Sequence, residues 1–135
     1  MKDRVFYDTN TIVYLYDETE VQKQKTIHQS FALVQPVIST QVLNEMSNIM
    51  LKKIKAEIST VDTIIDNLRD FTEIVRVDVA HIKKALVIKE KYKYSYYDSL
   101  IIASALEVKC KILYTEDMQH GHLINNELTI VNPYL

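Results

Sequence analysis

Four acidic residues stand where small or apolar residues would be usual. Asp8 and Asp117 each come just after a run typical of a buried strand, Asp98 begins the most apolar predicted helix, and Glu45 borders the apolar face of another helix. The carboxyl ends of neighbouring parallel strands and the helix starts that follow them meet around one crevice, where ligands bind. If the two strands are neighbours, we expect the four carboxylates to face that crevice.

Four ionised carboxylates in one crevice repel one another and resist the loss of water unless a cation joins them. Oxygen ligands without cysteine or an obligatory histidine suit Mg²⁺ or Mn²⁺, which keep waters available for a substrate. Such an ion can activate a water molecule and stabilise charge on a phosphoryl oxygen. The predicted chemistry is phosphodiester hydrolysis.

Each of the four residues also has a purely structural interpretation. Asp8 could cap the helix that follows it, and Asp117 could close an Asx-turn. Asp98 completes a capping-box pattern that begins at Ser95. Glu45 could lie at the solvent boundary of its helix. The hypothesis of a shared site therefore depends on the four residues taken together.

The hydrophobic pattern predicts the elements that would position these residues. Strands are predicted at 5–7, 37–38, 73–77, 111–114 and 128–131, and helices at 11–16, 20–34, 41–53, 57–71, 79–91 and 96–108. Strands separated by helices imply a parallel sheet that is covered on both faces. We expect an α/β fold in which residues 1–135 form a single domain.

The composition excludes several classes of protein. With Gly121 as its only glycine, the chain has neither a P-loop nor a dinucleotide-binding fingerprint, which need several residues without a Cβ atom. The single cysteine, Cys110, cannot form an intramolecular disulfide. No stretch resembles a leader or a membrane span, so a cytoplasmic protein without membrane contact is expected.

A lysine-rich helix could help to bind a nucleic acid, although the formal net charge is −2. Lys89, Lys91 and Lys93 could follow an RNA backbone, or they could form a solvated helix face. Tyr94 belongs to a group of tyrosines over residues 92–97 that could stack on bases or pack a helix junction. The sequence leaves both alternatives open.

Four segments, in chain order, resemble the successive motifs of PIN-domain ribonucleases, most closely those of VapC-type toxins from prokaryotic toxin–antitoxin pairs. The segments are residues 6–10, 37–45, 97–105 and 113–117. The resemblance implies a three-layer α/β/α fold around a central, mainly parallel sheet of five strands. It further implies cleavage of single-stranded or looped RNA at a Mg²⁺ or Mn²⁺ site that is built from Asp8, Glu45, Asp98 and Asp117.

The same resemblance suggests supporting residues and partners. Asn10 and Thr115 match polar positions that support the waters of the metal ion, and a cognate antitoxin and a homodimer are implied. The run after Thr115 resembles one subgroup of the family, which makes Glu116 a possible further acidic contact. His120 and His122 in the following loop could approach the site or lie in solvent.

The sequence thus predicts a metal-dependent endoribonuclease, the toxin of a type II toxin–antitoxin pair, which hydrolyses RNA with a metal-activated water. Two alternatives are a PIN nuclease of RNA processing or decay that has no antitoxin, and a catalytically degenerate module that binds metal or RNA. A receiver-like signalling domain is disfavoured because Asp8 has no paired acidic cluster and no lysine follows the later strand. A haloacid-dehalogenase-like phosphatase would need an aspartate where Asn10 stands.

Overall fold

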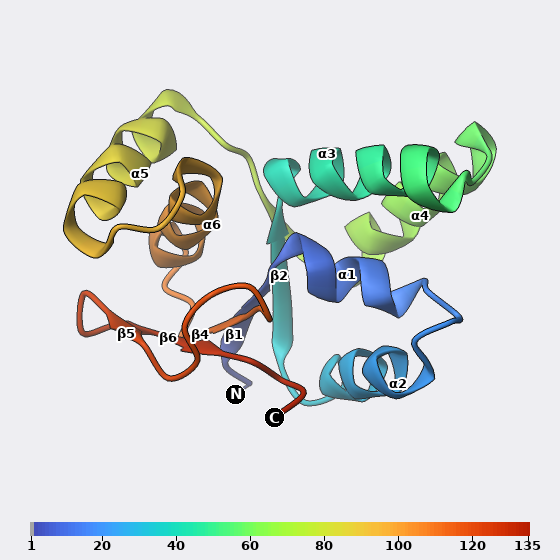
Figure 1. Cartoon of the computed structure of the whole chain (residues 1–135), viewed down its shortest axis with the longest axis horizontal. Coiled ribbons are helices and arrows are strands. Elements are labelled where there is room, and N and C mark those ends of the chain that lie inside the picture. Colours follow the sequence, from blue (N-terminus) through green and yellow to red (C-terminus); the bar gives the residue numbers. More distant parts are fainter. Residues whose placement is uncertain (1) are drawn as a thin grey trace.

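A six-stranded sheet forms the centre of the molecule in the computed structural model, which describes residues 2–135. The strand order is β3-β2-β1-β4-β6-β5, and all neighbouring strands are parallel except the pair of β5 and β6. Helices α1 to α4 lie on one side of the central strands, and α5 and α6 lie on the other (Figure 1). The predicted α/β architecture with a mainly parallel sheet is confirmed.

The strands and helices follow one another along the chain with short connections. The strands are β1 (Arg4–Tyr7), β2 (Gln35–Ser39), β3 (Glu73–Val75), β4 (Ile112–Tyr114), β5 (Leu123–Ile124) and β6 (Leu128–Val131). The helices are α1 (Thr9–Leu15), α2 (Val21–Ser30), α3 (Thr40–Ile49), the π-helical turn η1 (Met50–Ile54), α4 (Ile58–Phe71), α5 (Val79–Tyr92) and α6 (Tyr96–Glu107). Among residues 2–135, no helix is both long and apolar enough to cross a lipid bilayer.

The order of the strands reverses between β1 and β4. From β1 the chain moves outward to β2 and β3, and it then returns to place β4 on the other side of β1. The register pairs Val5 with Ile112 and Tyr7 with Tyr114, so the two strands end side by side. Such a switch point opens a crevice at the carboxyl edge of the sheet. Asp8 and Thr115 are the first residues beyond that edge.

Burial explains the sequence pattern of the central elements. Three consecutive residues of β1, Val5, Phe6 and Tyr7, are all at most 1% exposed, as expected of a strand that is covered on both faces. In α6 every residue from Ser99 to Leu106 is buried, which places this helix at the centre of the fold. Because all sides of α6 are covered, its sequence is apolar all round rather than amphipathic.

The expectation of five strands was wrong by one. The sixth strand, β5, has two residues and forms an antiparallel hairpin with β6. Residues 125–127 connect the two strands, and Asn125 and Asn126, the central residues of the turn, have φ angles of 49° and 60°. Positive φ at both central residues suits the right-handed twist of a tight hairpin, and asparagine tolerates this conformation better than most residues.

Several predicted boundaries also differ from the structure. The predicted helix over 20–34 ends as α2 at Ser30, and Phe31 continues as a turn whose ring packs on Tyr7 with 4.9 Å between ring centroids. The predicted helix over 41–53 is α3 followed by the π-helical turn η1, which Lys55 ends in a left-handed conformation. The helix predicted from residue 11 begins at Thr9, because Asp8 caps it.

Candidate active site

An open cleft of about 340 Å³ at the switch point of the sheet brings the four predicted carboxylates together. Asp8 comes from the end of β1, Asp117 from the loop after β4, Glu45 from α3 and Asp98 from the first turn of α6. The lining residues are Asp8, Thr9, Asn10, Glu45, Asn48, Ile49, Asp98 and Asp117. Their roles in catalysis or metal binding stay a prediction, but their placement in one cleft is a feature of the fold.

Asp8 is held by hydrogen bonds from two different elements. It is only 5% exposed. Its Oδ1 accepts a hydrogen bond from the backbone N–H of Thr9 at 2.7 Å, which caps α1. Its Oδ2 accepts a hydrogen bond of 2.7 Å from the Thr115 hydroxyl, which comes from the chain after the neighbouring strand. Asp8 is thus a helix cap and also a fixed wall of the cleft.

A short chain of polar contacts continues from Thr115 to Asp117. The fully buried Thr115 hydroxyl oxygen accepts a hydrogen bond from the backbone N–H of Asp117 at 3.2 Å. The side-chain amide of Asn10 donates to Asp117 Oδ2 at 2.7 Å. Asn10 and Thr115, which the sequence suggested as supporting residues, therefore hold the carboxylates of both strand ends.

The two helical carboxylates lie on other walls of the cleft. Glu45 Oε1 accepts a hydrogen bond of 2.6 Å from the Thr9 hydroxyl, which ties α3 to the start of α1. At the start of α6, the Ser95 hydroxyl accepts a hydrogen bond from the backbone N–H of Asp98 at 3.1 Å and so caps the helix. The Asp98 carboxylate is half-buried and lines the cleft.

Burial and nearby negative charges disfavour the ionised forms of Asp8 and Asp98. The pKa of Asp8 is raised to about 7, mainly by burial and less by the charges of Asp98 and Glu45, while the hydrogen bonds from Thr115 and Thr9 act to lower it. The pKa of Asp98 is also raised, first by burial and then by the charges of Asp117 and Glu45. The neighbouring charges therefore make it harder for Asp8 and Asp98 to ionise, and a cation in the cleft would relieve this repulsion.

The donor set fits a hard divalent cation. Within residues 2–135, no three acidic, histidine or cysteine side chains already converge tightly enough to form a metal cage. Four carboxylates around an open cleft instead suit an ion such as Mg²⁺ or Mn²⁺, which keeps several waters and binds few protein ligands. All four candidate donors are oxygen atoms, the donor type these ions prefer.

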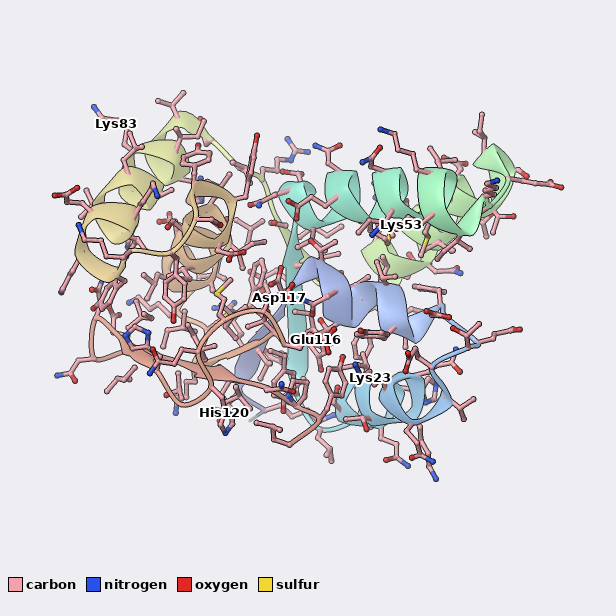
Figure 2. All side chains as sticks on the ribbon, in the orientation of Figure 1. Lys23, Lys53, Lys83, Glu116, Asp117 and His120 are labelled. Carbon is pink, nitrogen blue, oxygen red and sulfur yellow. The ribbon has the colours of Figure 1, made fainter. Side chains whose placement is uncertain are left out.

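Glu116 points away from the other acidic residues. Its carboxylate accepts a hydrogen bond from the Tyr14 hydroxyl and forms an ion pair with Lys23, whose Nζ lies 2.9 Å from Oε2. Figure 2 shows Glu116 between Asp117 and Lys23. Glu116 does not line the cleft of the four carboxylates. It instead joins the loop after β4 to α1 and α2, next to Asp117 in the chain.

The two histidines take part in contacts of the C-terminal hairpin. His120 Nδ1 accepts a hydrogen bond from the backbone N–H of Asn132 at 2.9 Å. His122 Nδ1 lies 2.7 Å from the Tyr94 hydroxyl, and its ring also packs edge-on against Tyr92. Neither histidine lines the acidic cleft. Tyr94 thus packs the junction of α5 and α6 against the hairpin of β5 and β6.

The three lysines that could bind RNA lie at the end of α5. Lys89 Nζ donates to the carbonyl oxygen of Tyr94 at 3.3 Å, and Lys91 Nζ lies 3.3 Å from Asn125 Oδ1. Lys93 ends the helix in a left-handed conformation and is exposed. None of them lines the acidic cleft. Binding of RNA by these lysines and Tyr94 stays a prediction.

Sequence reasoning missed a second pocket, of about 510 Å³, which shares Glu45 and Asn48 with the acidic cleft. Its characteristic residues are the amide side chains of Gln41, Asn44 and Asn48 on α3. These positions are spaced by three and four residues, which places them on one face of a helix together with Glu45. That spacing was the signal in the sequence that could have revealed the pocket.

Comparison with solved structures finds similar folds in toxins and toxin–antitoxin complexes. VapC20 of Mycobacterium tuberculosis, a toxin that cleaves the sarcin–ricin loop, matches with a TM-score of 0.66 and 18% identity over 84% of this chain and 89% of its own. A toxin–antitoxin complex from Klebsiella pneumoniae matches with a TM-score of 0.70 and 20% identity over 96% of this chain and 98% of its own. VapBC2 of Rickettsia felis, bound to a DNA fragment of its promoter, matches with a TM-score of 0.67 and 16% identity over 96% of this chain and 99% of its own.

These identities are low and establish the fold alone. Comparison with curated proteins gave no match. The family described as PIN domain, however, matches residues 5–123, which include the whole set of residues that line the acidic cleft. The match covers most of the sequence and agrees with the strand order and with the resemblance of the four motifs. The chain belongs to the PIN domain family, and its structural neighbours include VapC toxins.

Proposed function

We propose that the protein is a divalent-metal-dependent endoribonuclease that acts as the toxin of a type II toxin–antitoxin pair. The observation that carries this proposal is the cleft at the end of β1 and β4, where four carboxylates from four separate elements face one another. Burial and mutual repulsion raise the pKa of Asp8 to about 7, so the cleft is costly to ionise without a cation. A merely structural set of caps would not need this concentration of charge.

The residues of the cleft have separate roles in this proposal. Asp8, Asp98 and Asp117 would hold the ion, and Glu45 would bind it or orient a water molecule for attack. When bound, Mg²⁺ or Mn²⁺ supplies the acidity that activates water and the charge that stabilises a phosphoryl oxygen. Thr115 and Asn10 would keep Asp8 and Asp117 in position through the hydrogen bonds described above.

The structural neighbours support RNA as the substrate and an antitoxin as the partner. VapC20 is a toxin that cleaves the sarcin–ricin loop, and the Klebsiella pneumoniae structure is a toxin–antitoxin complex. By this likeness, the proposal includes a cognate antitoxin. It also includes a homodimer of the present chain, which the resemblance of the four motifs to VapC-type toxins implies. The carboxylate cleft supports hydrolysis of a phosphodiester bond independently of these neighbours.

An RNA-cleavage assay tests the proposal directly. The wild type should cut a structured RNA in Mn²⁺ and stop in EDTA. Asp8→Asn should lower the cleavage rate by roughly 100-fold or more, because the variant loses a charged member of the metal site. Asp66→Asn is a matched control, since Asp66 is an exposed carboxylate of α4 outside the cleft. Far-UV circular dichroism should show that both variants keep the α/β fold.

Three kinds of result would contradict the proposal in different ways. Full cleavage by Asp8→Asn, or by the wild type in EDTA, would remove the metal site and its chemistry. Metal-dependent cleavage without growth arrest on induced expression would instead favour a nuclease of RNA processing or decay. Binding of Mn²⁺ without any cleavage would identify a degenerate module.

A further inference from the structure

A pocket with few charges adjoins the acidic cleft. It is bounded by α3, the start of α6 and the link from β3 to α5, and its volume is about 510 Å³. The lining residues are Thr40, Gln41, Asn44, Glu45, Asn48, Val77, Tyr97 and Leu100. Because Glu45 and Asn48 line both spaces, a group in this pocket would lie directly beside a group in the acidic cleft.

The chemistry of the pocket suits a flat polar group without negative charge. Glu45 is the only ionisable acidic or basic side chain among its lining residues, and three others carry amides. Tyr97 is 63% exposed, and a T-shaped contact with Tyr96 orients its ring, with 5.3 Å between centroids. Aromatic rings that remain open to solvent offer stacking surfaces for bases, and side-chain amides can pair with base edges.

A buried amide in this pocket has an unused acceptor. Gln41 is only 8% exposed, and its Nε2 donates to the carbonyl oxygen of Tyr97 at 3.0 Å and lies 3.5 Å from Glu45 Oε2. These two acceptors fix the orientation of the amide. Its Oε1 has no hydrogen-bond partner among residues 2–135. Buried polar atoms rarely stay unpaired, so this acceptor indicates a donor that enters the pocket.

The neighbouring charges exclude a phosphate as the occupant. A phosphate in this pocket would lie against Glu45 and beside the other carboxylates of the acidic cleft, where like charges repel. An uncharged base carries amino or imino N–H donors, a flat face for Tyr97 and no such penalty. A nucleotide of single-stranded RNA has both parts, and its phosphate would extend toward a cation in the cleft.

We propose that this pocket binds one unpaired nucleobase next to the cleaved phosphate, with Tyr97 as the stacking surface and the amides of Gln41 and Asn44 contacting the base edge. The inference rests on the proposed ribonuclease function and names a subsite for its substrate. It implies that the protein prefers certain bases at one position beside the cleavage site. It also implies that this preference depends on residues that hold no metal ion.

A fluorescence titration tests the pocket without requiring cleavage. The probe is a single-stranded RNA oligonucleotide that carries 2-aminopurine, titrated in EDTA at low salt. Tyr97→Ala should weaken binding about 5- to 150-fold, the range measured when a stacking aromatic residue is removed. Tyr97→Phe should bind like the wild type, because it keeps the ring. Phe71→Ala is the control, since Phe71 is an aromatic residue of α4 that is 69% exposed and lies outside the pocket.

Cleavage in Mn²⁺ provides a second, independent measurement. Tyr97→Ala should raise KM more than it lowers kcat, and Asn44→Ala should relax the base preference at one position beside the cut. If the wild type binds the probe through Tyr97 but cuts no RNA, the pocket stands and the proposed catalytic function fails. If the wild type cuts RNA while Tyr97→Ala matches it in affinity, KM and base preference, the base pocket is overturned and the nuclease stands. A wild type that neither binds the probe nor cuts RNA overturns both.

Discussion

The strand side and the helix side of the acidic cleft are built in different ways. On the strand side, Thr115 donates to Asp8 and Asn10 donates to Asp117, so side chains from adjoining segments fix both carboxylates. These segments are aligned by the ladder of β1 and β4. On the helix side, Glu45 accepts one hydrogen bond, from Thr9, but the positions of Glu45 and Asp98 depend on how two separate helices, α3 and α6, pack against the rest of the fold.

This difference suggests how the site would assemble. The strand side is fixed before any ligand arrives, because its hydrogen bonds are already made. The four carboxylates do not yet form a tight cage. Asp8 and Asp117 would therefore hold a cation from preorganised positions, and Glu45 and Asp98 would complete the site, with the gain in attraction offsetting their repulsion.

The largest expected effect concerns the pH dependence of stability on the strand side. The pKa of Asp8 is raised from an ordinary value of 3.8 to about 7, mainly by burial. At a pH between these two pKa values, Asp8 holds a proton in the folded protein and has lost it in the unfolded chain. The free energy of unfolding of the metal-free protein should therefore fall as the pH rises from about 4 to about 7, by up to about 1.4 kcal/mol per pH unit for one proton.

Asp8→Asn should flatten this profile, because asparagine does not titrate. The pKa of Asp98 is also raised, so the free energy of unfolding of Asp8→Asn should still fall with rising pH, but less steeply than that of the wild type. Urea unfolding in EDTA at several pH values between 4 and 8 provides the measurement, with Asp66→Asn as the exposed control. Equal slopes of the free energy of unfolding against pH for the wild type and Asp8→Asn would mean that burial does not hinder the ionisation of Asp8. The strand side would then not differ from the helix side in its electrostatics.

A smaller effect is expected when the hydrogen bonds of the strand side are removed without a change of charge. Thr115→Val keeps the β-branched shape but deprives Asp8 of a donor and the Asp117 N–H of an acceptor. Loss of such a supporting contact typically costs 10- to 100-fold in metal affinity. Calorimetric titration with Mn²⁺ should detect this loss, whereas Thr129→Val on the neighbouring strand β6 should bind like the wild type.

An unchanged Mn²⁺ affinity in Thr115→Val would show that the strand side needs no such support. The variant also leaves buried polar groups unpaired, so its metal-free form should be less stable by about 1–3 kcal/mol. Comparison with the melting temperature of Thr129→Val separates this general loss of stability from the loss of metal affinity.

The central sheet and the cleft could be predicted because they rest on short-range patterns. A buried strand such as β1 has a continuous apolar run in its sequence, and the polar residues directly after it indicate the edge of the sheet where a site forms. The hairpin of β5 was missed because two residues are too few for any periodicity. Asn125 and Asn126 were the available signal, since consecutive asparagines suit a turn with positive φ.

Other features depend on contacts that the sequence does not display. Helical spacing continues from α3 into η1 through Met46 and Met50, so it gives no sign of the change to a π-helical turn. Glu116 stands beside Asp117 in the chain, and both lie in a bend after β4, where no regular period indicates which way each side chain points. Only the structure shows that Glu116 meets Tyr14 and Lys23 instead of the cleft.

The smallest expected effect concerns Asp98, on the helix side, and separates its two interpretations. The Ser95 hydroxyl already caps α6 by accepting the Asp98 N–H, so the cap does not require the Asp98 carboxylate. In EDTA, the free energy of unfolding of Asp98→Asn should fall by at most the roughly 0.3–1 kcal/mol that a negative charge contributes at a helix start. The variant also removes the repulsion between Asp98 and the charges of Asp117 and Glu45, which should offset this loss. The rise in melting temperature on addition of Mn²⁺ should shrink, because a ligand stabilises the fold in proportion to its affinity for the folded state.

Ser95→Ala is the matched control for this variant. It removes the capping oxygen and should cost about 1 kcal/mol in EDTA, but it should keep the full response to Mn²⁺. The two variants should therefore show opposite behaviour in a melting experiment with EDTA and with Mn²⁺. If Asp98→Asn instead behaves like Ser95→Ala, weakened in EDTA and undiminished in its Mn²⁺ response, then Asp98 belongs to the helix cap. The helix side of the cleft would then contribute Glu45 alone, and the metal site would have three carboxylates.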